Sequence, residues 1–347
     1  MTKVHDRASE VADQASDPGR GFDVLSDVLR TVRLRGAVFF LWEASSPFVT
    51  TVPPGERFAP VLLPDARQIV SYHVVVEGGC WGSLVGGSPL RLRAGDVLLI
   101  PRGDPYVMTS SEEACRSTPV DEEAAIEFFR MMAAGDLPFV IEDGGGGPER
   151  ARVVCGFLGC DVRPFNPVVA ALPAIVRLGP HAGLGEDRLR SLADYAVAEA
   201  RRPKPGSGGI LARLGELMFV EVVRRCLSEL PDAPRGWPAG LRDPVVARCL
   251  ALMHRRPADP WTLERLAAAV AVSRSGLAER FADKVGEPPI QYLTRWRLQL
   301  ATNLLGEDSL KVESIAHRVG YASGPAFSRA FKRVVGVTPT EWRQEGC

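Results

Sequence analysis

The 347-residue sequence lacks any long hydrophobic stretch. It contains no run of eighteen apolar residues, so no segment is suited to cross a membrane as a helix. The first twenty residues are polar and lack the apolar core of a secretory signal. We read residues 1–20 as a disordered tail, and we expect a cytoplasmic protein without a membrane partner.

Cysteine is sparse and odd in number, with seven residues in the whole chain. Such a set does not build the dense disulfide framework of small secreted proteins, so we expect reduced, structural thiols. Catalytic signatures are also missing. The sequence holds no phosphate-binding glycine loop, no His-Glu-x-x-His pattern and no Ser-His-Asp set, which leaves little to support catalysis.

Net charge is absent as well, because 42 Lys and Arg residues balance 42 Asp and Glu residues. The balance hides an asymmetry along the chain. Residues 241–347 hold 16 basic and 11 acidic side chains, and the remainder carries the opposite excess. A basic excess in one segment is typical of nucleic-acid binding, although an excess of this size is weak evidence alone.

The first of three compositional blocks is rich in strands. Between residues 21 and 179, short apolar runs with β-branched residues alternate with Gly and Pro, as at Gly36–Trp42, Ser71–Val76 and Asp96–Ile100. Runs of this length between turn signals predict the strands of a sandwich or a small barrel.

Helical patterns surround and follow this block. One short helix is expected at Phe22–Arg33, and an inserted loop or helix at Asp121–Ala134. Within residues 186–230, apolar residues recur at helical spacing on both sides of a break at Pro203–Gly209. This helical linker could pair with a second copy to form a homodimer, and packing on its own domain is the open alternative. A proline-rich boundary, Pro231–Pro244, precedes the last block, which reads as helical.

The last block contains an internal repeat. Five positions recur at a separation of fifty residues: Ser273, Leu277, Phe281, Gly286 and Pro289 match Ser323, Phe327, Phe331, Gly336 and Pro339. In each copy a first helix is followed by a tight turn, at Ala271 or Gly320, and a serine then caps a second helix. Apolar residues bury one face of that second helix, which leaves the other face for the DNA major groove. The repeat predicts two helix-turn-helix units, joined by a long helix at Ile290–Leu305.

This segment resembles the AraC/XylS family of regulators from about Pro244 to Arg343. The second copy reads Ile315-Ala-x-x-Val-Gly-Tyr-Ala-Ser-x-x-x-Phe-Ser-Arg-Ala-Phe-Lys332, followed by Gly336-x-Thr-Pro-x-x-Trp-Arg343. It is similar to the family signature almost position for position. The resemblance implies a transcription regulator that binds double-stranded operator DNA, often an activator that also contacts RNA polymerase.

In that family the base-reading residues lie early in the second helix of each unit. The resemblance therefore places DNA contacts at Ser273, Arg274, Ser275, Glu279 and Arg280, and at Ser323, Gly324, Pro325, Ser328, Arg329, Lys332 and Arg333. Gly324 and Pro325 carry no base-reading side chain, so the second helix would rely on its basic residues. Arg329 is the candidate for a guanine contact, with a phosphate contact as the alternative.

The strand-rich block resembles the cupin-like effector domain that precedes some AraC-type units. The matching residues are Val74–Gly78 and Gly95–Pro105, and the second stretch fits the cupin pattern Gly-x5-Pro-x-Gly. The resemblance covers about Asp23 to Leu178 and implies a β-barrel of the jelly-roll type that binds a small effector. The chain is thus expected to be an α+β multidomain protein, with an effector domain at 21–179, a helical linker at 186–230 and an all-α DNA-binding domain at 241–347.

The resemblance does not extend to the residues that bind metal in cupins. A metal-binding cupin has a histidine where this chain has Tyr106, and the other motif offers only His73. His73 and Tyr106 are therefore candidate effector contacts, with a core histidine as the alternative. A zinc or redox site is the other hypothesis, in which Cys155 and Cys160 are joined by His73 and by Cys80 or Cys115, although buried inert cysteines are the default. The alternative function is a metal-dependent cupin enzyme fused to a DNA-binding module.

Overall fold

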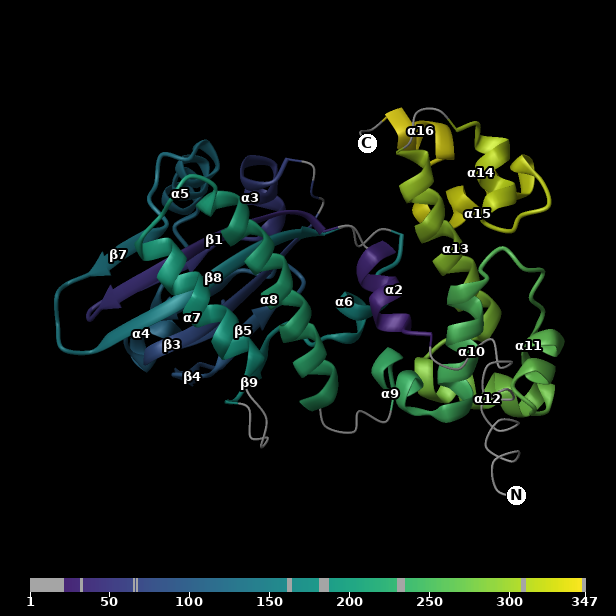
Figure 1. Cartoon of the computed structure of the whole chain (residues 1–347), viewed down its shortest axis with the longest axis horizontal. Coiled ribbons are helices and arrows are strands. Elements are labelled where there is room, and N and C mark those ends of the chain that lie inside the picture. Colours follow the sequence, from purple (N-terminus) through teal and green to yellow (C-terminus); the bar gives the residue numbers. More distant parts are fainter. Residues whose placement is uncertain are drawn as a thin grey trace, which may run out of the picture. The chain divides into compact units, whose positions relative to one another are not determined.

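The structure is a computed structural model, which describes residues 22–31, 34–64, 66, 68–160, 164–180, 187–229, 235–306 and 310–344. The expected tail at 1–20 and residues 231–234 of the proline-rich boundary lie outside these ranges. The chain forms two compact units (Figure 1). We call residues 33–162 and 172–230 the sheet unit, and residues 1–32, 163–171 and 231–347 the helical unit.

The sheet unit is built on a curled sheet. Its strands, within the described residues, are β1 (Leu34–Ser45), β2 (Val49–Val52), β3 (Gln68–Leu84), β4 (Leu90–Arg93), β5 (Val97–Ile100), β6 (Tyr106–Thr109), β7 (Val140–Gly144), β8 (Arg150–Cys160) and β9 (Val176–Leu178). The hydrogen-bonded order is β2-β6-β3-β8-β1-β7, while β4 and β5 also pair with β3, and β9 pairs with β5. The long β3 serves several neighbours, which curls the sheet into a half-barrel. The cupin-like fold and the three expected strands are confirmed.

The two faces of this sheet have different partners, because successive residues of a strand point to opposite sides. On one face, Cys155 and Phe157 of β8 join an apolar core with α3 (Gly55–Leu62) and α5 (Glu122–Ala134). On the other face, the Tyr72 hydroxyl donates to the carbonyl oxygen of Gly215 at 2.9 Å. Gly215 belongs to α8 (Ser207–Glu229), which crosses the sheet beside α7 (Arg188–Arg201) in Figure 1. A short helix, α4 (Glu112–Ser117), follows β6.

The expected linker helices are α7 and α8, and they pack on the sheet of their own unit. Ala193 of α7 is buried, as are Met218 and Val222 of α8. The same helices also expose large apolar side chains, since Tyr195 is 52% and Leu217 50% accessible. Only part of each apolar stripe is therefore covered within this chain.

The helical unit collects segments from three parts of the sequence. Its helices, in the part of the unit that the structure describes, are α2 (Val24–Thr31), α6 (Pro167–Ala171), α9 (Trp237–Arg242), α10 (Pro244–Arg255), α11 (Leu263–Ala269), α12 (Arg274–Val285), α13 (Pro289–Leu305), α14 (Val312–Arg318), α15 (Gly324–Val335) and α16 (Pro339–Gln344). The helices expected at Phe22–Arg33 and Ile290–Leu305 are confirmed as α2 and α13. The segment Asp121–Ala134, for which loop and helix were both open, forms α5.

Candidate DNA-binding helices and effector cavity

Two helix-turn-helix units are present, α11 with α12 and α14 with α15. The hydroxyl oxygen of Ser273 accepts a hydrogen bond from the backbone N–H of Gly276 at 3.1 Å. Ser323 accepts in the same way from the N–H of Ala326 at 3.4 Å. Each serine thus satisfies one of the N–H groups that a helix start leaves unpaired. The predicted N-caps are confirmed.

The turns and helix ends of the two copies also match. Ala271 has a φ of 59° and Gly320 one of 89°, so both turns use the left-handed region. Gly286 and Gly336 close α12 and α15 with φ values of 93° and 96°. At Gly320 a Cβ atom would lie only 2.8 Å from the backbone of Ala258, so this turn has no room for a side chain.

One glutamate in each unit contacts the start of the second helix, and neither was predicted from the sequence. Glu264 of α11 forms an ion pair with Arg274 at 3.0 Å. Glu313 of α14 accepts a hydrogen bond from the backbone N–H of Gly324 at 2.9 Å, and a Cβ on Gly324 would collide with that carboxylate. The two glutamates stand 49 positions apart, as Ala271 and Gly320 do, so the repeat itself held the signal.

Helix α15 separates a buried face from a basic face. Phe327 and Phe331 are fully buried, whereas Arg329, Lys332 and Arg333 are exposed. Arg329 forms no ion pair with any residue that the structure describes. Pro325 is exposed on the same helix and Ser328 is half-buried. The basic side chains of α15 are therefore available to a ligand outside the fold.

The predicted DNA-contacting residues of α12 differ in whether they have a partner within the protein. Ser275 and Glu279 are exposed. Arg280, in contrast, donates from Nε to the carboxylate of Asp243 at 2.8 Å, and Asp243 also caps α10 through two backbone N–H groups. Arg280 therefore has a structural partner.

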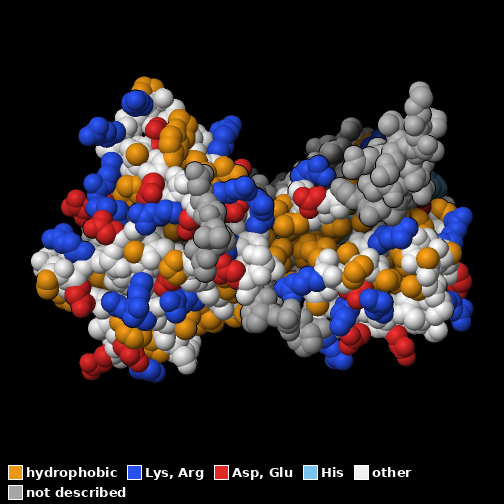
Figure 2. Space-filling model, turned by 60° about the horizontal axis from the view of Figure 1, so that its bottom comes forward, with side chains coloured by type: hydrophobic (Ala, Val, Ile, Leu, Met, Phe, Trp, Pro, Cys, Tyr) orange, Lys and Arg blue, Asp and Glu red, His pale blue; other side chains and the backbone are white. Residues whose placement is uncertain are grey.

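Figure 2 shows Lys and Arg interspersed with Asp and Glu over the face in view, in keeping with the zero net charge.

A cavity of about 490 Å³ lies inside the sheet unit, between the curled sheet and α5. Several aromatic side chains contribute to its walls, namely Phe40, Trp42, Phe128, Phe129 and Phe157. The volume falls in the range of ligand sites, which are mostly apolar with a few polar groups. A ligand cavity was predicted in this block, but its walls were not, because they come from two strands and a helix that are spread over more than a hundred residues of sequence.

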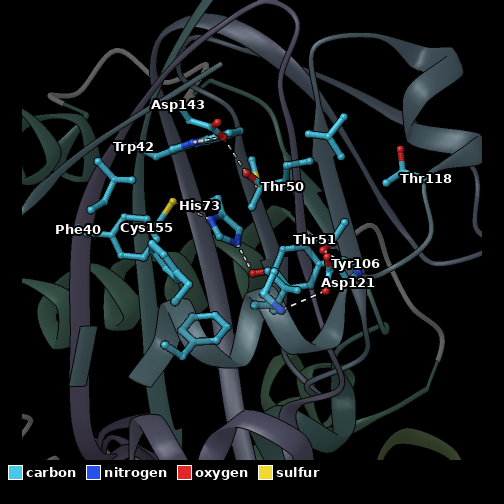
Figure 3. A pocket seen from close by; sticks show the side chains of 18 of the residues that line it. Phe40, Trp42, Thr50, Thr51, His73, Tyr106, Thr118, Asp121, Asp143 and Cys155 are labelled. Atoms are coloured by element: carbon cyan, nitrogen blue, oxygen red, sulfur yellow. Dashed lines mark hydrogen bonds between the residues drawn. The ribbon is translucent and has the colours of Figure 1, made fainter. Parts of the chain in front are cut away.

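Three polar side chains meet in this cavity (Figure 3). His73 Nε2 lies 2.6 Å from the hydroxyl oxygen of Tyr106, and His73 Nδ1 lies 3.2 Å from the sulfur of Cys155. All three are buried. Burial lowers the pKa of His73 to about 3, so the imidazole is neutral and donates through one nitrogen only. The structure thus brings together the two candidate effector contacts and one of the candidate cysteines.

The other candidate cysteines do not all join this group: Cys80 belongs to the same apolar core as Cys155, whereas Cys115 and Cys160 are not part of that core. Cys155 and Cys160 are five residues apart on β8, so their side chains point to opposite faces of the sheet. The Cys115 thiol contacts the hydroxyl of Ser83 at 3.4 Å, and Cys80 is buried. Within the described part of the chain, no three His, Cys, Asp or Glu side chains are placed to hold a metal ion. The five residues therefore do not form one site.

An acidic group on the cavity wall was not predicted. The carboxylate of Asp143 accepts hydrogen bonds from Trp42 Nε1 at 3.2 Å and from the Thr50 hydroxyl at 3.3 Å, as Figure 3 shows. Asp121 also lines the cavity and caps α5 by accepting from the N–H of Ala124 at 3.0 Å. Trp42 and Asp143 lie on neighbouring strands although a hundred residues separate them, so no local pattern could pair them.

Comparisons with known proteins agree with both halves of this description. Residues 23–228 match a cupin family, and residues 266–345 match a helix-turn-helix domain family. No helix in the described residues is long and apolar enough to cross a bilayer. The chain is 36% identical to an AraC-like transcription regulator of Streptomyces antibioticus, over 93% of this chain and 98% of that protein.

Two further relatives carry the same kind of name. An AraC-like transcription regulator of Streptomyces lividans is 34% identical over 93% of this chain and 98% of its own length. The HTH-type transcriptional regulator AlkR of Acinetobacter baylyi is 31% identical over 81% of this chain and 89% of its own length. These relatives are regulators, which decides against the alternative of a cupin enzyme fused to a DNA-binding module. The chain belongs to the AraC-like transcription regulators, with a cupin-like sheet unit ahead of a DNA-binding pair of helix-turn-helix units.

Proposed function

We propose that this regulator binds a small organic effector in the cavity of its sheet unit and that occupancy changes its affinity for operator DNA. The observation that carries the proposal is the cavity itself. It is about 490 Å³ in volume, several aromatic rings contribute to its walls, and it contains the neutral His73 beside Tyr106. A ligand can shift DNA affinity only through its different affinity for two arrangements of the protein, which is typically worth about 1–3 kcal/mol.

The connectivity of the chain supports a coupling between the cavity and the DNA-binding helices. Strands β1 and β8 pair with each other and supply Phe40, Trp42, Cys155 and Phe157 to the cavity. The segment before β1 is α2, and the segment after β8 contains Phe165; both belong to the helical unit. A ligand that displaces β1 or β8 would therefore also move the adjoining segments, α2 or residues 163–171, which belong to the helical unit.

The segment after β8 is held firmly within the helical unit. The backbone N–H of Phe165 donates to the side-chain oxygen of Gln299 at 2.9 Å, and Gln299 is fully buried on α13. The guanidinium of Arg295 lies 4.0 Å above the Phe165 ring. Because α13 connects the two helix-turn-helix units, a change at Phe165 would act on the element that sets their spacing.

For the DNA contacts, the exposed faces of α12 and α15 support Arg274, Ser275 and Glu279 in the first unit and Arg329, Lys332 and Arg333 in the second. Arg280 is the weaker candidate, because Asp243 already holds it. Ser273, Ser323 and Gly324 would present backbone groups at the helix starts, beside Pro325 and Ser328. We further propose a cytoplasmic activator that contacts RNA polymerase. The domain boundaries expected near residues 179, 186–230 and 241 stay a prediction, and the compact units differ from them, because residues 163–171 group with the helical unit and residues 172–230 with the sheet unit.

A homodimer is part of the same proposal. Ile210 and Leu217 are both exposed, and their spacing of seven residues puts them on one side of α8. Tyr195 of α7 is also exposed. Exposed apolar side chains on two adjacent helices favour pairing with a second copy of the chain.

The uncharged aromatic dye N-phenyl-1-naphthylamine provides the test, because its fluorescence rises in apolar cavities. Wild-type protein should bind the dye saturably, and a saturating dose should change the gel-shift affinity for an operator selected from random DNA. Ala124→Trp places a bulky side chain at the cavity wall and should abolish both effects. Ala133→Trp lies on the same helix outside the cavity and should preserve both. Dye binding that survives Ala124→Trp, or binding without any change in operator affinity, would refute the proposal.

A further inference from the structure

The charges that line the cavity are all of one sign. Asp121, Glu142 and Asp143 are the charged residues of the lining, and none of the described residues lining the cavity is Lys or Arg. Successive residues of a strand point to opposite faces, so of the two β7 residues it is the half-buried Asp143, and not the exposed Glu142, whose carboxylate lies in the cavity wall. The one histidine, His73, is neutral because burial lowers its pKa. An anionic ligand would meet repulsion here with no cation to offset it, and its desolvation would not be repaid.

Asp143 is the best placed of the three to select a ligand. Two hydrogen bonds, from Trp42 and Thr50, fix one of its oxygens, and Asp143 forms no ion pair among the described residues. Asp121 is engaged as the cap of α5, and Glu142 is exposed on β7. A rigid, half-buried carboxylate without a cationic partner in the described residues is suited to bind the cationic group of a ligand.

The aromatic walls near Asp143 are also suited to a cation. Trp42 donates a hydrogen bond from Nε1 to the Asp143 carboxylate. Its ring packs edge-to-face against that of Phe48, with ring centroids 5.1 Å apart. Phe40 of the sheet and Phe128 of α5 also line the cavity and form an edge-to-face pair, with ring centroids 5.5 Å apart. The faces of aromatic rings attract cations as well as apolar groups.

We infer that the effector is an organic cation, a protonated amine on an apolar or aromatic body, with its ammonium group at Asp143 and its body between the aromatic walls. This inference rests on the proposed function and adds the chemical class of the ligand. The neutral His73 and Tyr106 pair supplies a second polar point inside the cavity, where a hydroxyl or carbonyl of the same ligand could bind. Fatty acids and other carboxylates are rejected as effectors.

Three probes with one body and different end groups test the charge preference. They are 2-(1-naphthyl)ethylamine, 2-(1-naphthyl)ethanol and 1-naphthylacetate, each used to displace N-phenyl-1-naphthylamine from the full chain at neutral pH. The amine should compete about tenfold better than the alcohol, as one charge-assisted hydrogen bond allows, and the carboxylate should compete worst. Equal or better competition by the alcohol or the carboxylate would overturn the inference.

Asp143→Asn keeps the shape of the side chain and removes its charge. The amine should lose its advantage in this variant, while the alcohol keeps its affinity. Asp136→Asn removes an exposed carboxylate outside the cavity and should change neither. If the Asp143→Asn variant loses equal affinity for the amine and the alcohol, Asp143 is a packing residue and the inference is refuted. If this variant does not fold, the order of affinities of the three probes for the wild-type protein decides the question. If the amine wins but operator affinity does not respond, the proposed function fails while the ligand class stands.

Discussion

His254 Nδ1 lies 2.9 Å from the carboxylate of Asp27, which joins α10 to α2 within the helical unit. The other ring nitrogen lies 2.8 Å from the Tyr292 hydroxyl, and Trp237 Nε1 donates to that hydroxyl oxygen at 3.0 Å. A neutral imidazole has one N–H, so the network has a single consistent direction: Trp237 donates to Tyr292, Tyr292 to Nε2, and the Nδ1–H to Asp27. A helix from the far N-terminal part of the sequence thus completes the polar core of the helical unit.

Asp27→Ala should destabilise the helical unit. The substitution leaves His254 Nδ1 buried without an acceptor, and an orphaned buried donor costs about 1–3 kcal/mol. Urea unfolding followed by circular dichroism would measure the loss. Asp283→Ala, which removes a half-exposed carboxylate of the same unit, should cost far less. Equal effects of the two substitutions would show that the contact contributes nothing to stability.

Stability should fall as the pH is lowered from 6.5 toward 5. Burial lowers the pKa of His73 to about 3, and burial also lowers that of His254 despite the opposing effect of Asp27. The unfolded chain therefore takes up protons near pH 6.5 that the folded chain refuses, so the stability is fully present above that pH and lost below it. Each histidine contributes a slope of at most about 1.4 kcal/mol per pH unit.

The His73→Gln variant isolates one of these slopes. Its free energy of unfolding should depend less steeply on pH between 6.5 and 5 than that of the wild type, because Gln does not titrate there. Denaturant unfolding at several pH values in this interval makes the comparison. A variant with the wild-type slope would show that His73 binds a proton in the folded state.

The sequence was most informative where a pattern is local. The serine caps, the glycine ends and the turns at Ala271 and Gly320 each depend on a few neighbouring residues, so the repeat alone located both helix-turn-helix units. The pairing of His73 with Tyr106 was foreseen only as two separate candidates. Their distance depends on the register between β3 and its neighbours, which a single sequence does not specify.

Long-range packing explains what the sequence left out. Nothing near Asp27 indicates that it contacts His254, more than two hundred residues away, or that Phe165 reaches Gln299. The separation of Cys155 from Cys160 could have been inferred, because an odd spacing on a strand puts two side chains on opposite faces. The acidic character of the cavity could not, since it depends on which of many carboxylates face inward.

The two turns should respond in opposite ways to exchange of their residues. Gly320→Ala forces a side chain into a left-handed turn against the backbone of Ala258, and we expect a loss of about 2–3 kcal/mol. Ala271→Gly relieves strain of about 1–2 kcal/mol but adds about 0.5–1 kcal/mol of backbone entropy cost, so a small gain is expected. Thermal melts of both variants check the signs, and a stable Gly320→Ala protein would contradict the tight fit.

Leu217→Lys should weaken the proposed dimer without unfolding the chain. Leu217 is 50% exposed on α8, so a charge there costs little in the monomer but is costly in an apolar interface. Sedimentation velocity at micromolar concentrations would show a shift toward monomer. Val85→Lys, at a residue 47% exposed in a turn of the sheet unit, is the matched control and should remain dimeric. A wild-type monomer, with and without operator, would end the dimer proposal.

Arg329→Ala should weaken operator binding, because Arg329 is exposed on the basic face of α15 and forms no ion pair among the described residues. A bidentate guanine contact predicts a loss of about 1–3 kcal/mol and relaxed preference at one base pair. A phosphate contact predicts a similar weakening for all sequences and a smaller salt dependence. Gel shifts on the selected operator and its single-base variants, at two salt concentrations, separate these outcomes. Arg224→Ala, which removes an exposed arginine of α8, should leave affinity unchanged, and an Arg329→Ala protein that matches it would exclude Arg329 from the DNA interface.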